Sequence, residues 1–377
     1  MDPLVSIIVS SYNYSAYLRD AIDSALGQSY PRIEVIVVDD GSTDDSPVII
    51  KNYEGKIKYI LKENGGQASA FNAGFRISRG DIIIFLDSDD ILYPSAVEEA
   101  VRKFEEPGVV KVHWMLDEIN ADGKKTNKVS PRFALAEGDL RRDVIQYGPS
   151  RCGGAPYSPP TSGNAWARFF LARVLPIPEA EYRTCTDQYL QVLAPVYGFL
   201  RCINASLGGY RVHGSNYSLN PVEDYKNEYF KRFEQSCRIL NQHLRLMEIE
   251  ADAAGWPRDS WFHKMQACID DILQVVPRDE SFIHVDGDEW GIGDSLEGRK
   301  RKLFIERNGE YWGTPVNDDQ AIEEIERQWE QGVGFIVFTW TTFWLLDFYT
   351  GMHKYLETHY NCALKNERAV IYKLRSD

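Results

Sequence analysis

The chain has 377 residues, enough for two domains, and its 44% hydrophobic and 26% charged residues are typical of a globular protein. Its net charge of −14 argues against nucleic acid as a partner, because proteins bind phosphate backbones through basic surfaces. The six cysteines form no Cys-x-x-Cys pair and no signal peptide is visible, so we expect reduced thiols and a cytoplasmic protein. Peripheral contact with the inner face of the membrane is the alternative location. No apolar stretch is long and unbroken enough for a transmembrane segment.

Short apolar runs alternate with amphipathic segments up to Asp90. Strands are expected at Val5–Ser10, Glu34–Val38, Lys58–Lys62 and Asp81–Leu86. Helices are expected at Tyr17–Gln28, Pro47–Tyr53 and Ala68–Ile77. Strands and helices alternating at this spacing predict a mostly parallel, Rossmann-like sheet flanked by helices, with right-handed crossovers.

A polar cluster follows each expected strand. The four clusters are Ser10–Asn13, Asp39–Ser42, Asn64–Gly66 and Asp87–Asp90. Ligands of parallel sheets bind at the carboxyl ends of the strands, where these clusters converge. The sequence therefore predicts a nucleotide site at this edge.

After Asp90 the pattern predicts a hairpin, two helices and a strand. The hairpin joins Val109–Glu118 to Asn127–Arg132 around the turn Ala121-Asp122-Gly123. Helices are expected at Trp166–Val174 and around Thr186–Ala194, and a strand near Ser206–Arg211. We expect the first domain to comprise residues 1–218.

Residues 219–377 are expected to form an accessory domain, with a helical segment at Glu223–Ala254 and a small α/β part. The small part is expected to contain strands at Phe282–Val285, Gly334–Phe338 and Ala369–Leu374, and helices at Asp319–Gln331 and Phe343–His359. This region holds seven of the nine tryptophans, which at core spacing are more often core than a sugar-binding surface. The sequence indicates neither an activity for this region nor an oligomeric state.

The segment Asp87-Ser88-Asp89-Asp90 directly follows an apolar strand. Two carboxylates beside a nucleotide diphosphate repel it by about 4 kcal/mol per charge pair at ~4 Å, using an effective dielectric constant of ~20. A divalent cation with hard oxygen ligands, Mg²⁺ or Mn²⁺, relieves that repulsion. The alternative is helix capping, with Asp90 preceding a helix at Ile91–Ala100.

Five ordered motifs between Val5 and His213 together resemble the inverting glycosyltransferases of family 2, which have the GT-A fold. They are Val5-Ser6-Ile7-Ile8-Val9-Ser10-Ser11-Tyr12-Asn13, Val38-Asp39-Asp40-Gly41-Ser42-Thr43-Asp44, Glu63-Asn64-Gly65-Gly66, Phe85-Leu86-Asp87-Ser88-Asp89-Asp90 and Tyr210-Arg211-Val212-His213. The resemblance implies a domain that transfers a sugar from a nucleotide-diphosphate sugar to an acceptor hydroxyl.

The resemblance also implies a donor site. It assigns Ser10, Tyr12, Asn13, Asp40, Asn64, Gln67, Asp87 and Ser88 to that site. Tyr12 would pack on the base, and Asp40 would accept a hydrogen bond from its N–H, which favours UDP- or dTDP-sugars. Asn64 and Gln67 would lie beside the nucleoside, or cap the following helix, and Asp87 would approach the ribose. For Asp39 we favour turn formation.

Asp89 and His213 are the implied metal ligands for Mn²⁺ or Mg²⁺. Arg211 would stabilise the leaving diphosphate, or is a surface charge. The segment Thr161-Ser162-Gly163-Asn164 either caps a helix or borders the donor sugar.

Asp187 is the implied catalytic base. Family members place a Glu-Asp pair at a helix start, whereas this chain has Thr186-Asp187. The alternative role for Asp187 is N-capping.

The sequence thus predicts a metal-assisted inverting glycosyltransferase acting on a lipid-linked glycan, a polysaccharide end or a protein. Two alternatives remain: an inactive nucleotide-sugar sensor or scaffold, favoured by Thr186, and a nucleotidyltransferase. A nucleotidyltransferase normally has a Gly-rich basic loop near its N-terminus, where this chain has Ser10-Ser11-Tyr12-Asn13.

Overall fold

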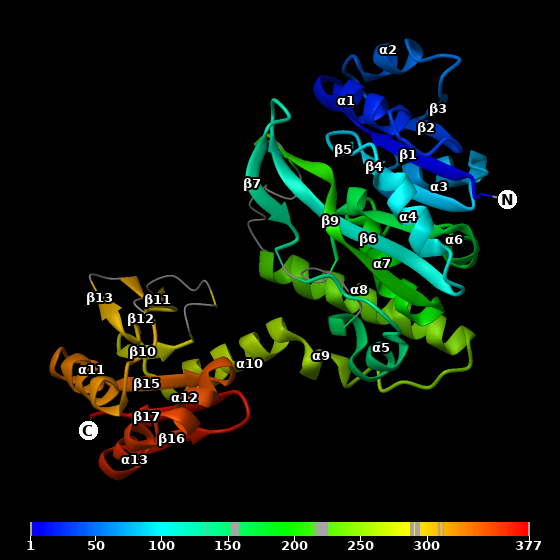
Figure 1. The fold of residues 1–377 in the computed structure, drawn as a ribbon. Coiled ribbons are helices and arrows are strands. Elements are labelled where there is room, and N and C mark those ends of the chain that lie inside the picture. Colours follow the sequence, from blue (N-terminus) through cyan, green and yellow to red (C-terminus); the bar gives the residue numbers. More distant parts are fainter. Residues whose placement is uncertain are drawn as a thin grey trace. The chain divides into compact units, whose positions relative to one another are not determined.

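The computed structural model divides the chain into two compact units, residues 1–256 and 257–377 (Figure 1). It describes residues 2–132, 134–151, 158–214, 216, 225–286, 290, 295–307, 310–311 and 313–375. The division lies beyond the boundary expected after residue 218. Helix α8 (Tyr225–Leu246) belongs to the first unit because its Leu240 and Leu244 pack with Val192 and Val196 in one apolar cluster.

The first unit is built on a mixed sheet in the order β3-β2-β1-β4-β8-β6-β9-β5, with β7 paired to β6. The strands are β1 (Val5–Ser11), β2 (Ile33–Asp39), β3 (Lys58–Leu61), β4 (Ile82–Asp87), β5 (Ile91–Leu92), β6 (Val109–Asn120), β7 (Lys125–Ser130), β8 (Asn164–Ala167) and β9 (Phe199–Val212). Strands β1 to β4 are parallel, as predicted, and β6 is parallel to β9. The carboxyl ends of β1, β2 and β4 therefore meet at one edge.

Helices cover both faces of this sheet. They are α1 (Ser15–Leu26), α2 (Ser46–Lys51), α3 (Gln67–Ile77), α4 (Ala96–Phe104), α6 (Arg168–Val174) and α7 (Thr186–Tyr197). Helices α5 (Arg141–Tyr147) and α8 pack against α7 instead, and α9 (Trp256–Asp259) begins at the last residue of the first unit. Ile7 on β1 packs in a cluster with α1, α2 and α4, whereas its neighbour Ile8 packs in a cluster with α3, α6 and α7. Alternate residues of a strand point to opposite faces, so a strand buried on both sides is apolar throughout.

The region after Asp90 confirms the predicted hairpin but departs from the prediction at three places. Ile91–Leu92 is strand β5 and the next helix begins only at Ala96, with Ser95 as N-cap, so the alternative that Asp90 caps a helix at Ile91–Ala100 is wrong. The expected helix at Trp166–Val174 begins at Arg168, because residues 164–167 form β8 between β4 and β6. Strand β9 is longer than the expected Ser206–Arg211 segment because it pairs along β6.

The second unit is a small α/β domain with a sheet in the order β11-β12-β10-β15-β17-β16. Its strands are β10 (Ser281–Val285), β11 (Ser295–Leu296), β12 (Arg299–Leu303), β13 (Glu306–Arg307), β14 (Glu310–Tyr311), β15 (Phe335–Thr339), β16 (Asn361–Lys365) and β17 (Ala369–Lys373). Its helices are α10 (Trp261–Val275), α11 (Asp318–Glu330), α12 (Phe343–Phe348) and α13 (Thr350–His359). The single helix expected at Phe343–His359 is interrupted at Tyr349, whose φ and ψ of −92° and 73° are not helical.

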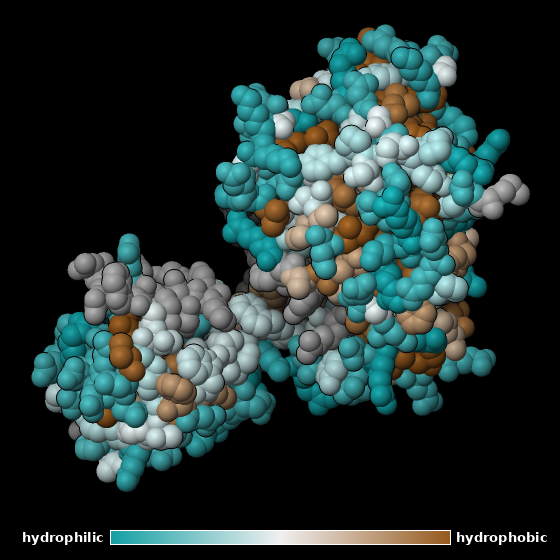
Figure 2. Space-filling model, viewed as in Figure 1, coloured by the Kyte–Doolittle hydropathy of each residue, from teal (hydrophilic) through white to brown (hydrophobic). Residues whose placement is uncertain are grey.

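The face of the molecule in Figure 2 is mainly hydrophilic, with small apolar patches scattered over it. Within the described ranges, no helix has both the length and the apolar character needed to cross a bilayer. The apolar Val333–Tyr349 stretch is a buried strand, β15, followed by α12, as predicted.

Candidate active site

A cavity of about 1010 Å³ opens at the edge where β1, β2 and β4 end. Most of the predicted site residues line it: Ser10, Tyr12, Asn13, Asp40, Asn64, Gln67, Asp87, Ser88, Asp89 and Asp187. Arg211 and His213 are not part of the lining. The cavity is of the size that encloses a ligand larger than most drug molecules, and five aspartates including Asp90 face it.

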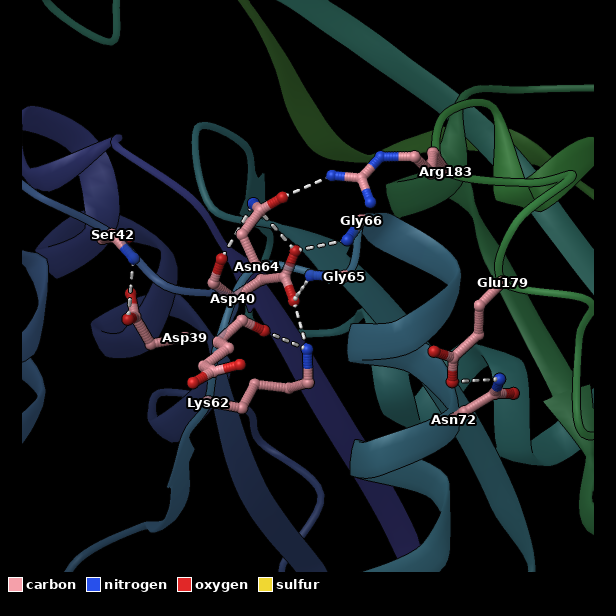
Figure 3. A network of polar contacts seen from close by, with 11 residues as sticks. Asp39, Asp40, Ser42, Lys62, Asn64, Gly65, Gly66, Asn72, Glu179 and Arg183 are labelled. Atoms are coloured by element: carbon pink, nitrogen blue, oxygen red, sulfur yellow. Dashed lines mark hydrogen bonds and ion pairs between the residues drawn. The ribbon is translucent and has the colours of Figure 1, made fainter.

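Asp40 is buried at the end of β2 and holds the loop that leads into α3 (Figure 3). Its carboxylate accepts four hydrogen bonds: from Lys62 Nζ at 2.6 Å and Gly65 N at 3.0 Å on Oδ1, and from Asn64 Nδ2 at 3.1 Å and Gly66 N at 2.7 Å on Oδ2. Two carboxylate oxygens offer about four acceptor positions. Asp40 is thus saturated, and a base N–H that binds it has to replace one of these donors.

The turn after β2 is tied to the end of β1. Asp39 Oδ2 accepts a hydrogen bond from Ser42 N at 3.0 Å, which confirms the turn-forming role predicted for Asp39. Asn13, with a φ of 58°, accepts from Thr43 N at 2.8 Å and donates its own N–H to Ser42 Oγ at 2.9 Å. These contacts place the exposed ring of Tyr12, 47% accessible, at the wall of the cavity.

Asp87 lies at the end of β4 and receives hydrogen bonds from Gln67 Nε2 at 3.0 Å and Ser10 Oγ at 3.4 Å. Burial, followed by repulsion from Asp89 and Asp187, raises the pKa of Asp87 to about 7. The other end of the Gln67 side chain accepts the Thr186 N–H at 3.1 Å. One amide therefore connects the donor-side carboxylate to the first residue of α7.

Asp89 lies beside His213, with 3.2 Å between Oδ2 and Nε2, and Asn216 Nδ2 is 3.4 Å from the same oxygen. Neighbouring ligands of an octahedral ion at about 2.1 Å lie about 3.0 Å apart, so the Asp89–His213 spacing fits a shared divalent cation. Across the described ranges there is no group of three or more His, Cys, Asp or Glu that could hold an ion. A cation here would need further ligands beyond Asp89 and His213.

Arg211 lies behind the carboxylates rather than in the cavity. Its guanidinium is 1% exposed and donates to Asp89 O at 2.7 Å, Ala121 O at 2.9 Å and Asp20 Oδ2 at 2.9 Å. This differs from both sequence expectations, a diphosphate contact and a surface charge. The reason is that β9 runs beside the Asp89 backbone, so the side chain is used to hold that backbone.

Ser162 anchors the aspartate segment from the opposite side. Its hydroxyl donates to Asp90 Oδ2 at 2.6 Å and accepts the Asp87 N–H at 3.2 Å. Burial, followed by repulsion from Asp89 and Asp87, raises the pKa of Asp90 well above its usual value. Of the four residues that precede the expected helix, Thr161 lines the cavity while Ser162 holds Asp87 and Asp90 in place.

Asp187 lies in the first turn of α7, whose N-cap is Cys185, so Asp187 is not the N-cap. Its Oδ2 accepts a hydrogen bond from Gln191 Nε2 at 3.0 Å, and burial raises its pKa. Thr186 is buried and donates its hydroxyl to Tyr182 O at 2.8 Å. The residue that replaces the family's usual acid therefore does not line the cavity, whereas Asp187 does.

Comparison with known proteins supports a single family. The model for glycosyl transferase family 2 matches residues 6–168. A relative from Nostoc sp., described as an uncharacterized glycosyltransferase, is 37% identical over 244 residues, which cover 64% of this chain and 74% of that protein. The chain belongs to glycosyltransferase family 2.

Two further proteins are similar, one over a smaller part of the chain and the other at lower sequence identity. A chondroitin synthase of Pasteurella multocida is 38% identical over 125 residues, 32% of this chain and 13% of that protein. A mannosyltransferase from Pyrobaculum calidifontis in complex with GDP-Man and Mn²⁺ has 19% sequence identity and a TM-score of 0.47, covering 74% of this chain and 77% of that one.

Several residues of this glycosyltransferase's cavity were missed from the sequence. Tyr14, Arg183 and Gln191 all line it. Burial, followed by the charges of Asp89 and Asp87, raises the pKa of Tyr14 to about 12. The signal for Tyr14 was its position two residues after Tyr12. The signal for Gln191 was its position four residues after Asp187 on an expected helix, a spacing that places both side chains on one face. No local pattern marked Arg183, which lies in the loop before α7.

The nine-stranded mixed sheet with its flanking helices is the GT-A fold expected from the family resemblance. Asp87, Asp89 and Asp187 of this glycosyltransferase line one cavity.

Proposed function

We propose that this chain catalyses an inverting, metal-assisted transfer of a sugar from a UDP- or dTDP-sugar to an acceptor hydroxyl, with Asp187 as the base. The observation that carries the proposal is that Asp187 lines the same cavity as Asp87 and Asp89 and raises the pKa of Asp87 through its charge. Electrostatic coupling between two groups requires that they lie close together. A base that close to the donor carboxylates is within reach of a sugar held between them.

The donor's base would lie between Tyr12 and Asp40. Tyr12 offers an exposed aromatic face at the cavity wall. Asn64 Nδ2 donates both to Asp40 Oδ2 and to Asp40 O, the latter at 2.9 Å. It can release the carboxylate and keep its backbone partner, which frees one acceptor position for the N–H of uracil or thymine.

The spacing of Asp89 and His213 fits a divalent cation, and Mn²⁺ or Mg²⁺ suits this ligand set. When bound, such an ion neutralises charge that develops on the leaving diphosphate. The protein's own contribution is to hold the ligands in place. Arg211 fixes the Asp89 backbone and Asn216 donates to Arg211 O at 2.6 Å, so the ligands are positioned from buried residues.

In the transfer step, the acceptor oxygen attacks the anomeric carbon from the side opposite the diphosphate. The new carbon–oxygen bond forms as the bond to the diphosphate breaks, and the hydroxyl proton passes to Asp187. Burial raises the pKa of Asp187, which strengthens its affinity for that proton. The nucleoside diphosphate leaves and the configuration at the anomeric carbon is inverted.

The acceptor is a hydroxyl of a lipid-linked glycan, a polysaccharide or a protein, and polysaccharide biosynthesis is favoured by the similarity to a chondroitin synthase. We place the enzyme in the cytoplasm, including the inner face of the membrane. Among the described cysteines, Cys185, Cys202, Cys237, Cys268 and Cys362, none forms a disulfide. Reduced thiols are typical of that compartment.

A thermal-shift screen of UDP-, dTDP- and GDP-sugars, each with Mn²⁺ and with a chelator, tests the proposal. A ligand at ~100 times its dissociation constant adds about 2.7 kcal/mol to the free energy of unfolding. We expect a UDP- or dTDP-sugar to raise the melting temperature only with Mn²⁺, and Asp89→Asn to remove that dependence. If no nucleotide sugar gives a metal-dependent shift, the proposal is wrong.

A further inference from the structure

Lys111 is a buried cation directly behind the wall of the cavity. It lies on β6 with no exposed surface, and its Nζ donates to Ser158 Oγ at 2.7 Å and lies 5.2 Å from the centre of the Trp166 ring. Within the described ranges it has no ion pair closer than 4.0 Å. Burial of an ammonium group without a nearby carboxylate is costly, so such a lysine is rarely retained for packing alone.

A short path of contacts leads from Lys111 to Asp187. Ser158, the hydrogen-bond partner of Lys111, is followed by Pro159, whose carbonyl accepts Gln191 Nε2 at 3.3 Å. Gln191 Nε2 also donates to Asp187 Oδ2 at 3.0 Å. Ser158, Pro159, Gln191 and Asp187 all line the cavity, so Lys111 lies one layer behind the surface that the acceptor would meet.

Among the described residues, Asp187 acts on Lys111, and two further titratable groups, His113 and Asp87, face this pair. Asp187 comes from α7 and its charge acts on Lys111, while His113 comes from β6 itself. Asp87, at the end of β4, faces Asp187. Burial and then the Lys111 charge lower the pKa of His113 well below its usual value, so His113 is neutral, and it contacts Ala136 O through Nε2 at 2.7 Å.

We infer that Lys111 is a positioning residue that acts as the buried counter-ion of Asp187, keeping this carboxylate ionised although other carboxylates line the same cavity. The inference rests on the proposed role of Asp187 as base. Gln191 holds the carboxylate in place, and the ammonium supplies positive charge from behind the wall. Burial lowers the pKa of Lys111 to about 7, so the ammonium is present in the acidic range where a carboxylate takes up its proton.

The inference predicts how the proton affinity of Asp187 depends on Lys111. The carboxyl ¹³C resonance of Asp187, assigned by its loss in Asp187→Asn, reports the titration of this one group without any substrate. In Lys111→Met, which removes the charge and keeps the length, we expect the titration midpoint of Asp187 to rise by about one pH unit. Lys125→Met is the matched control, because Lys125 is exposed on β7 and pairs with Asp117 instead; there the midpoint stays unchanged.

The wild-type protein provides a measurement that does not depend on whether a variant folds. As the pH passes through about 7, Lys111 loses its proton, and the Asp187 resonance should show a second inflection at the midpoint of the Lys111 Nζ resonance. The Asp87 carboxyl, whose pKa is also about 7, is followed in the same titration so that its effect on Asp187 is distinguished from that of Lys111. An Asp187 midpoint unchanged in a folded Lys111→Met, or a wild-type curve without the second inflection, would overturn the inference.

Donor turnover separates this inference from the proposed function. Released nucleoside diphosphate is measured against pH with the nucleotide sugar that gives the largest thermal shift. In Lys111→Met we expect the acidic limb of kcat to move up by about one pH unit while KM for the donor stays constant. If Asp187→Asn keeps its turnover, the base assignment fails. If Asp187→Asn is inactive and the acidic limb does not move in Lys111→Met, only the role of Lys111 fails.

Discussion

The cavity has a proposed nucleotide end at Asp40 and a proposed base end at Asp187, and buried charge is stabilised in opposite ways at the two ends. At the nucleotide end, Asp40 accepts hydrogen bonds from four donors, one of which is its ion-pair partner Lys62 at 2.6 Å. At the base end, Lys111 has one hydrogen-bond partner, and burial moves the pKa values of both Lys111 and Asp187 toward neutrality. A saturated carboxylate gives a rigid loop of defined shape. Desolvated groups give proton affinities that suit acid–base chemistry near pH 7.

The largest expected effect is at the base end. Asp187→Asn should lower kcat by about 10²–10⁴-fold, or roughly 3–5 kcal/mol of barrier, because no group is left to take the acceptor proton. The affinity for nucleotide sugar should stay within about twofold, since the proposed role of Asp187 is to take the acceptor's proton and not to bind the donor. Isothermal titration and turnover measured on the same sample check both parts, and near-normal turnover contradicts the assignment.

The cost of burying Lys111 should appear in the pH dependence of stability. Its pKa is lowered from 10.5 to about 7 by burial, so the unfolded chain binds more protons than the folded one between these values. Stability of the wild type should therefore rise with pH in that window. Lys111→Met lacks this dependence. The difference in the free energy of unfolding between Lys111→Met and wild type should therefore favour the variant by about 2–3 kcal/mol more at pH 6 than at pH 9. Urea unfolding at the two pH values measures it, and an equal gain at both would show that Lys111 is not desolvated.

Replacing Asp40, whose carboxylate accepts four hydrogen bonds, should destabilise the loop that it holds. Asp40→Asn replaces two of the accepting positions by N–H donors facing other donors, so we expect a loss of about 2–3 kcal/mol in the free energy of unfolding. Asp39→Asn is the control, because Asp39 accepts only the Ser42 N–H in the described structure. Chemical denaturation of both variants should rank Asp40 first. A greater loss for Asp39 would contradict the comparison.

The smallest expected difference between a variant and its control concerns the loop that Asp40 holds. Gly66 has a φ of 93°, and a Cβ there would lie 2.8 Å from Arg183 Cα, so Gly66→Ala combines backbone strain with a clash. Gly55 has a φ of 85° with nothing within 4 Å of a Cβ. Gly55→Ala should therefore cost about 1 kcal/mol from strain alone, and Gly66→Ala about 1–2 kcal/mol more. Equal losses on thermal unfolding would show that the Arg183 loop moves aside.

The sequence predicted the donor end of the cavity better than the base end. Asp40, Asp87 and Asp89 each follow an apolar strand within a local motif, so their convergence could be read from the chain order alone. Lys111 lies behind the cavity wall on β6, and its place there depends on packing between distant segments that has no local signature. The buried position of Arg211 could not be predicted either, because it depends on how β9 aligns with the Asp89 backbone.

The fold shows the same difference between local and long-range information. The predicted strands β1 to β4 and the β6–β7 hairpin depend on period and turn residues, and both were confirmed. Strand β8 was missed because Ala165, Trp166 and Ala167 form a short apolar run that continues directly into the next helix, and only pairing with β4 and β6 shows that it is a strand. The boundary of the first unit also depends on long-range packing, through Leu240 and Leu244 of α8.

The Gln67 side chain has a consequence for how kinetic data on this enzyme are interpreted. Its amide joins Asp87 to the Thr186 N–H, so we expect a shift of Asp87 on donor binding to reach the first turn of the helix that carries Asp187. Gln67→Leu removes both contacts together. A variant that affected only ground-state binding of the donor would raise KM alone, whereas this one should also lower kcat. We therefore expect substitutions of Gln67 to change donor recognition and catalytic rate together.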